Sequence, residues 1–394
     1  MIYQLSQYIL DIAKAQGWEE SVSWLRIFSY VSVRAVGAAL TAFALCMLLG
    51  KSVIQWLKDI APEVYTPEWA KNSPGESGAQ KAEEAVSEAL KKKHGVPSMG
   101  GILIVGVMDV SALFWGVWNE LLLLTVLSMI VLAGLGFYDD YRKVTRAGEG
   151  APEWVKIGVQ LALGLILVSY LYTDSRVSFL IEEVMVPFYK EPIMPVGVVS
   201  SIVGAFVVIL AVFGSSNAVN LTDGMDGLAI GCTLICSVVF LVITYVTGRV
   251  DYSAYLNLTY VRGACELTVF CAALGGACLG FLWFNCHPAH VFMGDTGSLA
   301  IGGAFGIMAV LVHQPFILLI AGGVFVMEIG SSALQRYYFK VTRIWTGTGK
   351  RIFLRAPLHH HLQRLGWSET QVVTRLYIIG VIFAVLALAS LKIR

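Results

Sequence analysis

Long apolar stretches are the sequence feature that most constrains the fold of this chain. A helix that crosses ~30 Å of hydrocarbon needs about 20 mostly apolar residues. About ten stretches approach this requirement, and they lie near residues 25–49, 98–118, 120–138, 155–172, 196–216, 228–247, 264–284, 297–312, 314–335 and 373–391. We therefore predict an all-α integral membrane protein with about ten transmembrane helices, in which residues 1–394 form a single polytopic membrane domain.

The composition excludes the main alternatives to a membrane protein. Of the 394 residues, 57% are hydrophobic and 14% are charged, whereas soluble domains are roughly 45–50% apolar and about 25% charged. Disordered chains are poor in apolar residues. The net charge of +1 provides no broad basic surface, so no nucleic-acid partner is expected. The seven cysteines form no CxxC pair, which argues against a zinc ribbon or a redox motif.

The distribution of lysine and arginine predicts the orientation in the membrane. Of the 28 basic residues, seven lie in 50–97, four in 138–156 and eight in 336–375. Because basic loops stay in the cytoplasm, these segments are expected there and both termini are expected on the outer side. Residues 50–97 would form the first cytoplasmic loop, with an extra helix-like stretch at 79–93. Residues 336–372 would form the last cytoplasmic loop, which contains a run of three histidines.

Polar residues that could carry chemistry collect in a few places. Asp139 and Asp140 follow the third apolar stretch. A second group, at the end of the fifth stretch, consists of Asn220, Asp223 and Asp226. A third group, Asn285 and Asp295, precedes the eighth stretch, and the last cytoplasmic loop contains His359, His360 and His361. If the helices alternate, all of these groups reach the cytoplasmic side. The pattern therefore predicts one composite site built from cytoplasmic loops.

The residue types suit a divalent cation and a phosphate. Several carboxylates with asparagine neighbours favour Mg²⁺. Adjacent Asp139 and Asp140 point about 100° apart on a helix, so we expect them to have different roles. Asp223 and Asp226 are three residues apart and could share a helical face. The free N–H groups of Gly294–Ser298, at the start of the eighth stretch, could bind a phosphate.

Each group also has an ordinary structural interpretation. The aspartate pair could simply end a helix at the membrane interface. Residues 220–226 could form a capped turn, and Asp295 could be a helix N-cap. The three histidines could merely be solvated, although phosphate contact or proton transfer fits them better than a metal site does. The convergence of all groups on one side favours a functional site.

Five runs of residues resemble the phospho-N-acetylmuramoyl-pentapeptide transferases, members of the polyprenyl-phosphate N-acetylhexosamine-1-phosphate transferase superfamily. The runs occur in the order typical of that family. They are Lys93–Gly101 (KHGVPSMGG), Asp139–Lys143 (DDYRK), Asn220–Gly227 (NLTDGMDG), Asn285–Ser298 (NCHPAHVFMGDTGS) and Ala356–His361 (APLHHH). Val96 and Ser98 replace the usual threonines, Met225 replaces a common leucine, and the 72–92 stretch is longer than usual.

The resemblance implies a specific activity. Such an enzyme transfers phospho-MurNAc-pentapeptide from UDP-MurNAc-pentapeptide to undecaprenyl phosphate, which yields lipid I and UMP in peptidoglycan synthesis. It has ten spanning helices, requires Mg²⁺, and works as a homodimer in the bacterial plasma (inner) membrane with its active site in the cytoplasm. The remaining partner is the lipid bilayer itself.

The resemblance also implies roles for individual residues. Asp295 would be the Mg²⁺ ligand, and the catalytic residues would be Asp139, Asp140, Asp295 and His360. Phe292 would stack on uracil, and the histidines would hold the sugar–diphosphate end. The substrate-binding residues would be Lys93, Lys143, Asn220, Asp223, Asp226, Asn285, Phe292, Ser298, His359 and His361.

The sequence leaves alternatives open for the donor substrate, the function class and the reaction mechanism. A sister branch of the superfamily would use UDP-GlcNAc as donor, although the APLHHH and PSMGG runs favour the muramyl branch. A secondary transporter would place its acids near the middle of the bilayer and often shows inverted repeats, whereas here the acids lie at helix ends. For the reaction, we expect direct attack by the lipid phosphate; the alternative is a covalent phospho-aspartate on Asp295 or Asp139.

Overall fold

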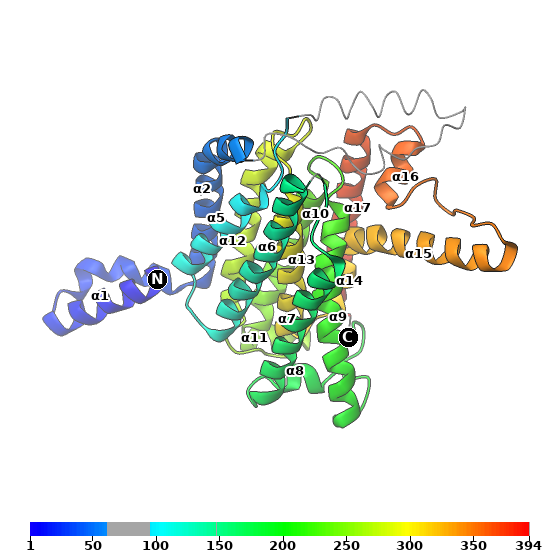
Figure 1. Ribbon diagram of the computed structural model, residues 1–394. Helices are drawn as coiled ribbons and strands as arrows, with labels where there is room; N and C mark the ends of the chain where they lie inside the picture. The colour runs from blue at the N-terminus through cyan, green and yellow to red at the C-terminus, as the bar shows by residue number, and fades with distance from the viewer. Residues whose placement is uncertain (61–94, 147, 394) are drawn as a thin grey trace.

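A computed structural model describes residues 1–60, 95–146 and 148–393 as an assembly of helices (Figure 1). Within these ranges, eight helices are long and apolar enough to cross a membrane, which confirms an all-α, multi-pass membrane protein. They are α2 (Val31–Ile60), α6 (Glu120–Thr145), α7 (Glu153–Thr173), α9 (Val198–Thr222), α10 (Leu228–Thr247), α12 (Cys265–Asn285), α13 (Gly294–Leu311) and α17 (Glu369–Ser390). The helix expected at 79–93, and Lys93 with it, lie outside the described residues.

The predicted count of about ten spans is not confirmed. The second apolar stretch forms α5 (Gly101–Trp115), whose 15 residues are fewer than a straight span needs. The ninth stretch is divided at Gly322 into α14 (Ile317–Ala321) and α15 (Gly323–Thr346). Figure 1 shows α15 running sideways out of the bundle. Glycine at the junction weakens helix continuity, and the charged residues that follow oppose burial in hydrocarbon.

The boundaries of the first span also differ from expectation. Residues 25–29 belong to η1 (Glu19–Ser29), a 3₁₀ segment, and α2 continues to Ile60 instead of ending near residue 49. Lys51 and Lys58 are exposed on this continuation, so water can solvate it. The predicted first cytoplasmic loop therefore begins as helix. At the other end of α2, η1 and α1 (Ile2–Gln16) project sideways from the bundle (Figure 1).

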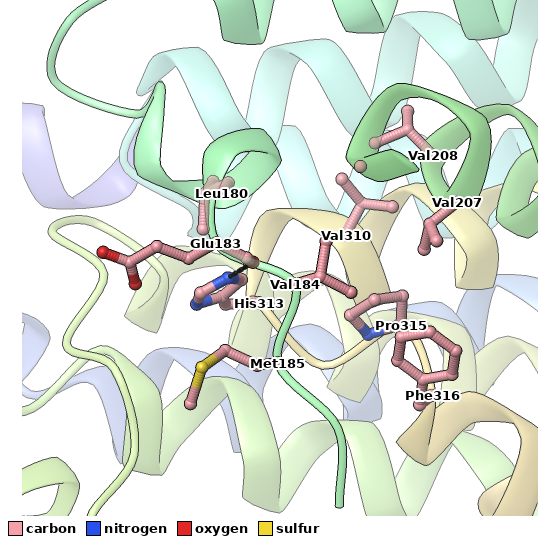
Figure 2. Close-up of a pocket in the computed structure, with 11 residues that line it drawn as sticks. Leu180, Glu183, Val184, Met185, Val207, Val208, Val310, His313, Pro315 and Phe316 are labelled. Atoms are coloured by element: carbon pink, nitrogen blue, oxygen red, sulfur yellow. Dashed lines mark hydrogen bonds between the residues drawn. The ribbon is translucent and has the colours of Figure 1, made fainter. Parts of the chain in front are cut away.

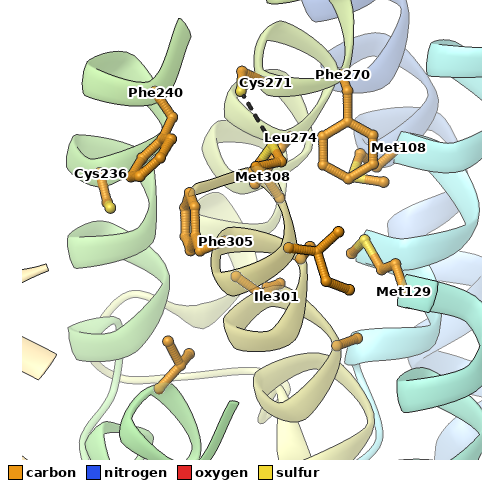
Figure 3. Close-up of a cluster of buried hydrophobic side chains, with 14 of the residues drawn as sticks. Met108, Met129, Cys236, Phe240, Phe270, Cys271, Leu274, Ile301, Phe305 and Met308 are labelled. Carbon is orange, nitrogen blue, oxygen red and sulfur yellow. Dashed lines mark hydrogen bonds between the residues drawn. The ribbon is translucent and has the colours of Figure 1, made fainter. Parts of the chain in front are cut away.

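Helix α13 occupies the centre of the bundle and packs against α6 and α9. Apolar side chains surround it: Phe305 contacts Phe240 of α10, and Met308 lies beside Cys271 of α12 (Figure 3). A helix that is apolar on all sides is stable only when protein or lipid encloses it. This packing holds the first turn of α13, which carries Asp295, in a fixed position.

Glycine residues allow the closest helix contacts around α13. A Cβ atom at Gly136 of α6 would lie 2.1 Å from the backbone oxygen of Asp295, whereas Gly134, two residues earlier, faces open space. The pair offers a matched test of this contact. We expect Gly136→Ala to destabilise the protein by about 1–3 kcal/mol, as overpacking generally does. Gly134→Ala should not lower the melting temperature in detergent, and equal melting temperatures for the two variants would contradict the model of a tight α6–α13 contact.

The opposite end of the bundle contains a small, mostly apolar cavity (Figure 2). Leu180 of α8 (Phe179–Glu182) and Val310 of α13 contribute to its lining. Buried His313 donates from Nε2 to the backbone oxygen of Glu183 at 2.8 Å and contacts Thr259 Oγ1 through Nδ1 at 3.0 Å. These bonds tie the connection after α13 to two neighbouring loops, which is a structural role.

Candidate active site

The two adjacent aspartates near the end of α6 are buried and have different partners. Asp139 Oδ2 lies 2.5 Å from Lys143 Nζ, and Asp139 Oδ1 lies 2.8 Å from Lys156 Nζ on α7. Asp139 Oδ1 also accepts a hydrogen bond from the backbone N–H of Ala151 at 2.6 Å. Asp139 therefore connects the ends of α6 and α7. The divergence of the pair follows from the ~100° between neighbouring residues of a helix.

Asp140 binds the first turn of α13. Its carboxylate accepts hydrogen bonds from the backbone N–H groups of Asp295 and Thr296, at 3.1 and 2.9 Å, and from Thr296 Oγ1 at 2.8 Å. A carboxylate at this position also interacts favourably with the helix dipole. The sequence predicted that the free N–H groups of Gly294–Ser298 bind a phosphate, but in the structure two of these groups donate to Asp140. The first turn of α13 is thus capped by a side chain from another helix.

Asp295 lies where four helices meet. Its Oδ2 is 3.1 Å from both Lys143 Nζ and Lys156 Nζ, and its Oδ1 accepts a hydrogen bond from Asn220 Nδ2 at 2.8 Å. Asn220 Nδ2 also donates to Ser298 Oγ at 2.9 Å. The predicted residues Asp139, Asp140, Lys143, Asn220, Asp295 and Ser298 are therefore brought together as one cluster.

Lys156 belongs to this cluster, although its sequence context predicted only a basic residue of a cytoplasmic loop. It bridges Asp139 and Asp295, and its side chain is 25% exposed. Lys156 belongs to none of the recognised sequence motifs and lies in the first turn of the apolar helix α7. Only the packing of α7 beside α6 and α9 reveals its role.

The charge balance of the cluster suits a cation. Asp139, Asp140 and Asp295 each offer one carboxylate oxygen within 4.8 Å of the others, and among the described residues the ammonium groups of Lys143 and Lys156 are the cations that pair with these three carboxyl groups. Burial, together with the negative charges of Asp295 and Asp140, raises the pKa of nearby Asp223 to about 7. Carboxylate oxygens are the ligands that hard divalent cations prefer. The residues present therefore fit a divalent metal ion.

Asp226 does not share a helical face with Asp223, contrary to expectation, because α9 ends at Thr222 and residues 223–227 form turns. Its Oδ2 instead contacts His287 Nδ1 at 2.9 Å and accepts from the backbone N–H of Ala289 at 3.2 Å. Its backbone N–H donates to Glu369 Oε1 of α17 at 3.0 Å. Asp226, His287 and Glu369 form a second group whose possible ligand atoms lie within 4.8 Å of one another, and the bonds among these residues join three segments of the chain.

Asn285 and Phe292 hold the connections around the cluster. Asn285 is buried; its Oδ1 accepts from the N–H of Gly227 at 3.1 Å and its Nδ2 donates to the carbonyl of Val291 at 2.8 Å. The backbone N–H of half-buried Phe292 donates to the carbonyl of Pro97 at 2.9 Å, and its carbonyl accepts from Gly100 at 2.9 Å. The described part of the 93–101 run thus lies against the 285–298 run.

The three histidines occupy α16 (Leu358–Arg364) and point in different directions. Buried His359 contacts Glu328 of α15, with 3.0 Å between Nδ1 and Oε2. His360 Nδ1 donates to Gln363 Oε1, and His361 Nδ1 accepts from the N–H of Leu354. Burial and neighbouring His359 and Arg355 lower the pKa of His360 to about 3, so this ring is neutral at physiological pH. His359 packs against the 220–227 run, beside Gly224.

These features define a multi-pass membrane protein with a carboxylate–lysine site at one end of its helical bundle. Comparison with known proteins gives the family. The model of glycosyl transferase family 4 matches residues 122–313. Proteins named phospho-N-acetylmuramoyl-pentapeptide-transferase match nearly the whole chain: one from Methylacidiphilum infernorum is 44% identical (94% of this chain, 96% of the relative). One from Chloroherpeton thalassium is 39% identical over 100% of both chains, and one from Neisseria meningitidis serogroup C is 42% identical (98% and 99%).

The chain belongs to the phospho-N-acetylmuramoyl-pentapeptide-transferase family. The resemblance stated from five motifs is thereby confirmed, and the match extends well beyond those motifs.

Proposed function

We propose that this protein transfers phospho-MurNAc-pentapeptide from UDP-MurNAc-pentapeptide to undecaprenyl phosphate, forming lipid I and releasing UMP. The observation that carries the proposal is the cluster in which Lys143 and Lys156 lie between Asp139 and Asp295. Both substrates bring negative phosphates, which repel each other in the absence of the enzyme. A partly buried site with two ammonium groups and cation-binding carboxylates is suited to bring such groups together.

In the proposed reaction, an oxygen of the lipid phosphate attacks the phosphorus attached to the sugar. The bond from that phosphorus to the oxygen of UMP breaks, and UMP leaves. Because the attacking oxygen is already anionic near neutral pH, little proton transfer is required. Asp139 would orient the lipid phosphate, while Lys143 and Lys156 offset the phosphate charges. We propose this direct transfer in preference to a covalent phospho-aspartate.

Mg²⁺ is the proposed cofactor, with Asp295 as its ligand and Asp139 and Asp140 beside it. The fit depends on the three carboxylates and the excess of negative charge around them. When bound, the ion would supply positive charge to the donor diphosphate and the departing UMP. Asn220, through its bond to Asp295 Oδ1, would hold the orientation of that carboxylate.

The proposed setting is the bacterial inner membrane, with the active site in the cytoplasm, both termini in the periplasm and a homodimeric assembly. The positive-inside rule supports this orientation, because the basic segments 50–97, 138–156 and 336–375 adjoin the site motifs in sequence. The remaining predicted contacts of Lys93, Asp223, Asp226, Asn285, His360 and His361 with substrate stay proposals.

UMP release by the purified protein tests the proposed function directly. The assay would contain undecaprenyl phosphate and Mg²⁺, with either UDP-MurNAc-pentapeptide or UDP-GlcNAc as donor. Turnover with the muramyl donor alone is expected. Turnover with UDP-GlcNAc alone would assign the protein to the sister branch. A folded sample that used neither donor would refute the proposal and bring back the transporter hypothesis.

Removal of the Phe292 ring should weaken uridine nucleotide binding. An aromatic ring stacked on a base contributes about 1–3 kcal/mol, so Phe292→Ala is expected to raise the UMP inhibition constant by roughly 5–150-fold. The backbone bonds of residue 292 do not involve its ring, so the loop should persist. Phe206→Ala, which removes an exposed ring on α9, is the matched control. Equal UMP inhibition in both variants would exclude stacking by Phe292.

A further inference from the structure

The buried pair formed by Glu328 and His359 is unusual in its hydrogen bonding. Glu328 Oε2 accepts from both the Nδ1 group and the backbone N–H of His359, at 3.0 and 3.3 Å. Within the described residues, Glu328 Oε1 and His359 Nε2 are both buried without a hydrogen-bond partner. Leaving buried polar atoms unpaired costs about 1–3 kcal/mol each. An arrangement that stability alone does not favour points to a role in function.

The carboxylate determines which ring nitrogen of His359 is available. Because Glu328 Oε2 accepts from the backbone N–H of His359, its contact with Nδ1 is assigned as a second accepted bond, which puts the imidazole proton on Nδ1 and holds the ring in one orientation. The other nitrogen, Nε2, then faces the turn that follows α9. A Cβ atom at Gly224 would lie only 2.4 Å from Nε2. Gly224 directly follows Asp223, whose carboxyl group lies close enough to Asp295 and Asp140 for their negative charges to raise its pKa.

The fold explains how Glu328 reaches this position. The break at Gly322 turns α15 away from α14, and Glu328 lies within the second turn of α15. The short helix α16 packs against α15 and brings His359 over the carboxylate. Two segments that are 31 residues apart thus build one dyad behind the 220–227 run.

We propose that Glu328 is a positioning residue, which holds His359 with Nε2 directed at the Asp223–Gly224 turn so that this atom binds the sugar–diphosphate end of the donor. The inference rests on the proposed function and deepens it, because Glu328 acts through His359 and touches no substrate itself. A purely structural pair would need only the Glu328–Nδ1 bond, whereas the proposed role needs Nε2.

Two substitutions of His359 separate these roles. The amide of His359→Asn retains a donor near the Nδ1 position and loses Nε2, whereas His359→Gln places its amide near the Nε2 position. We expect His359→Gln to retain at least tenfold higher kcat/KM than His359→Asn, while His359→Asn has the higher melting temperature. If His359→Asn is both the more stable and the more active variant, the pair is structural and the proposal fails.

A double-mutant cycle tests whether Glu328 acts through His359. Glu328→Gln is expected to lower kcat/KM by about 10–100-fold in the native background, and by less than about threefold when combined with His359→Asn. Equal losses in both backgrounds would overturn the proposal. Glu191→Gln, at an exposed position, controls for loss of one negative charge.

Nitrogen-15 NMR of the histidine rings provides a test that needs no turnover. The signals that disappear in His359→Asn identify His359, and they should show a proton on Nδ1 and none on Nε2 of the neutral ring. A proton on Nε2 alone would refute the proposed orientation even in an inactive preparation. Absence of turnover in the native protein, with the expected NMR result, would instead count against the proposed function.

Discussion

Asp295→Asn is expected to lower kcat by about 10³-fold or more, which is the upper range for loss of one preorganised charged group at a reacting centre. The substitution keeps the size of the side chain and an oxygen that can accept from Asn220. It removes the negative charge that faces Lys143 and Lys156 at 3.1 Å. UMP release at saturating donor and acceptor measures the effect. Titration with Mg²⁺ should show that no accessible concentration restores the rate.

A matched control separates this effect from a general loss of charge. Asp251, at the opposite end of the bundle, pairs with Arg249 only at 3.9 Å and has an 85% exposed side chain. Asp251→Asn should therefore leave kcat within twofold of the native value, a typical limit for an exposed site. Unaltered melting temperatures would show that both variants are folded. Mg²⁺-dependent turnover by Asp295→Asn at the native rate would remove Asp295 from the metal role.

Lys156→Met is expected to lower kcat/KM by about 10²–10³-fold. The methionine preserves most of the apolar stem but removes the ammonium group that bridges Asp139 and Asp295. Buried Asp139 then keeps Lys143 as its only cationic partner among the described residues. Lys156→Arg keeps the charge with a longer, planar group and should recover part of the activity. Steady-state kinetics of UMP release compares the three proteins.

The control for this prediction is Lys190→Met, which removes an exposed lysine in the connection between α8 and α9. Native kinetics in Lys190→Met, together with a large loss in Lys156→Met, would place the effect at the cluster. A Lys156→Met protein with native kcat/KM would show that the lysine balances charge in the resting protein without assisting the reaction.

Helix positions were predictable because hydrophobicity is a local property of the sequence. Eight of the apolar stretches appear as spanning helices, and the runs containing Asp139, Asn220 and Asp295 were recognised as parts of one site. The ninth stretch shows the limit of this reasoning. Residues 314–335 are apolar enough to resemble one span, yet Gly322 and the surrounding packing divide them into α14 and α15.

The amino-acid sequence by itself determined the membrane class, the family and the residue types of the site, because these depend on composition and on ordered motifs. Only the tertiary structure decided which groups meet. In the folded protein, Asp140 accepts hydrogen bonds from the first turn of α13, and Lys156 lies between the carboxylates of Asp139 and Asp295. Asp226 contacts His287 and does not share a helical face with Asp223, and Glu328 contacts His359. The physical reason is that such contacts join residues up to 156 positions apart, and their geometry depends on how whole helices pack rather than on any local pattern.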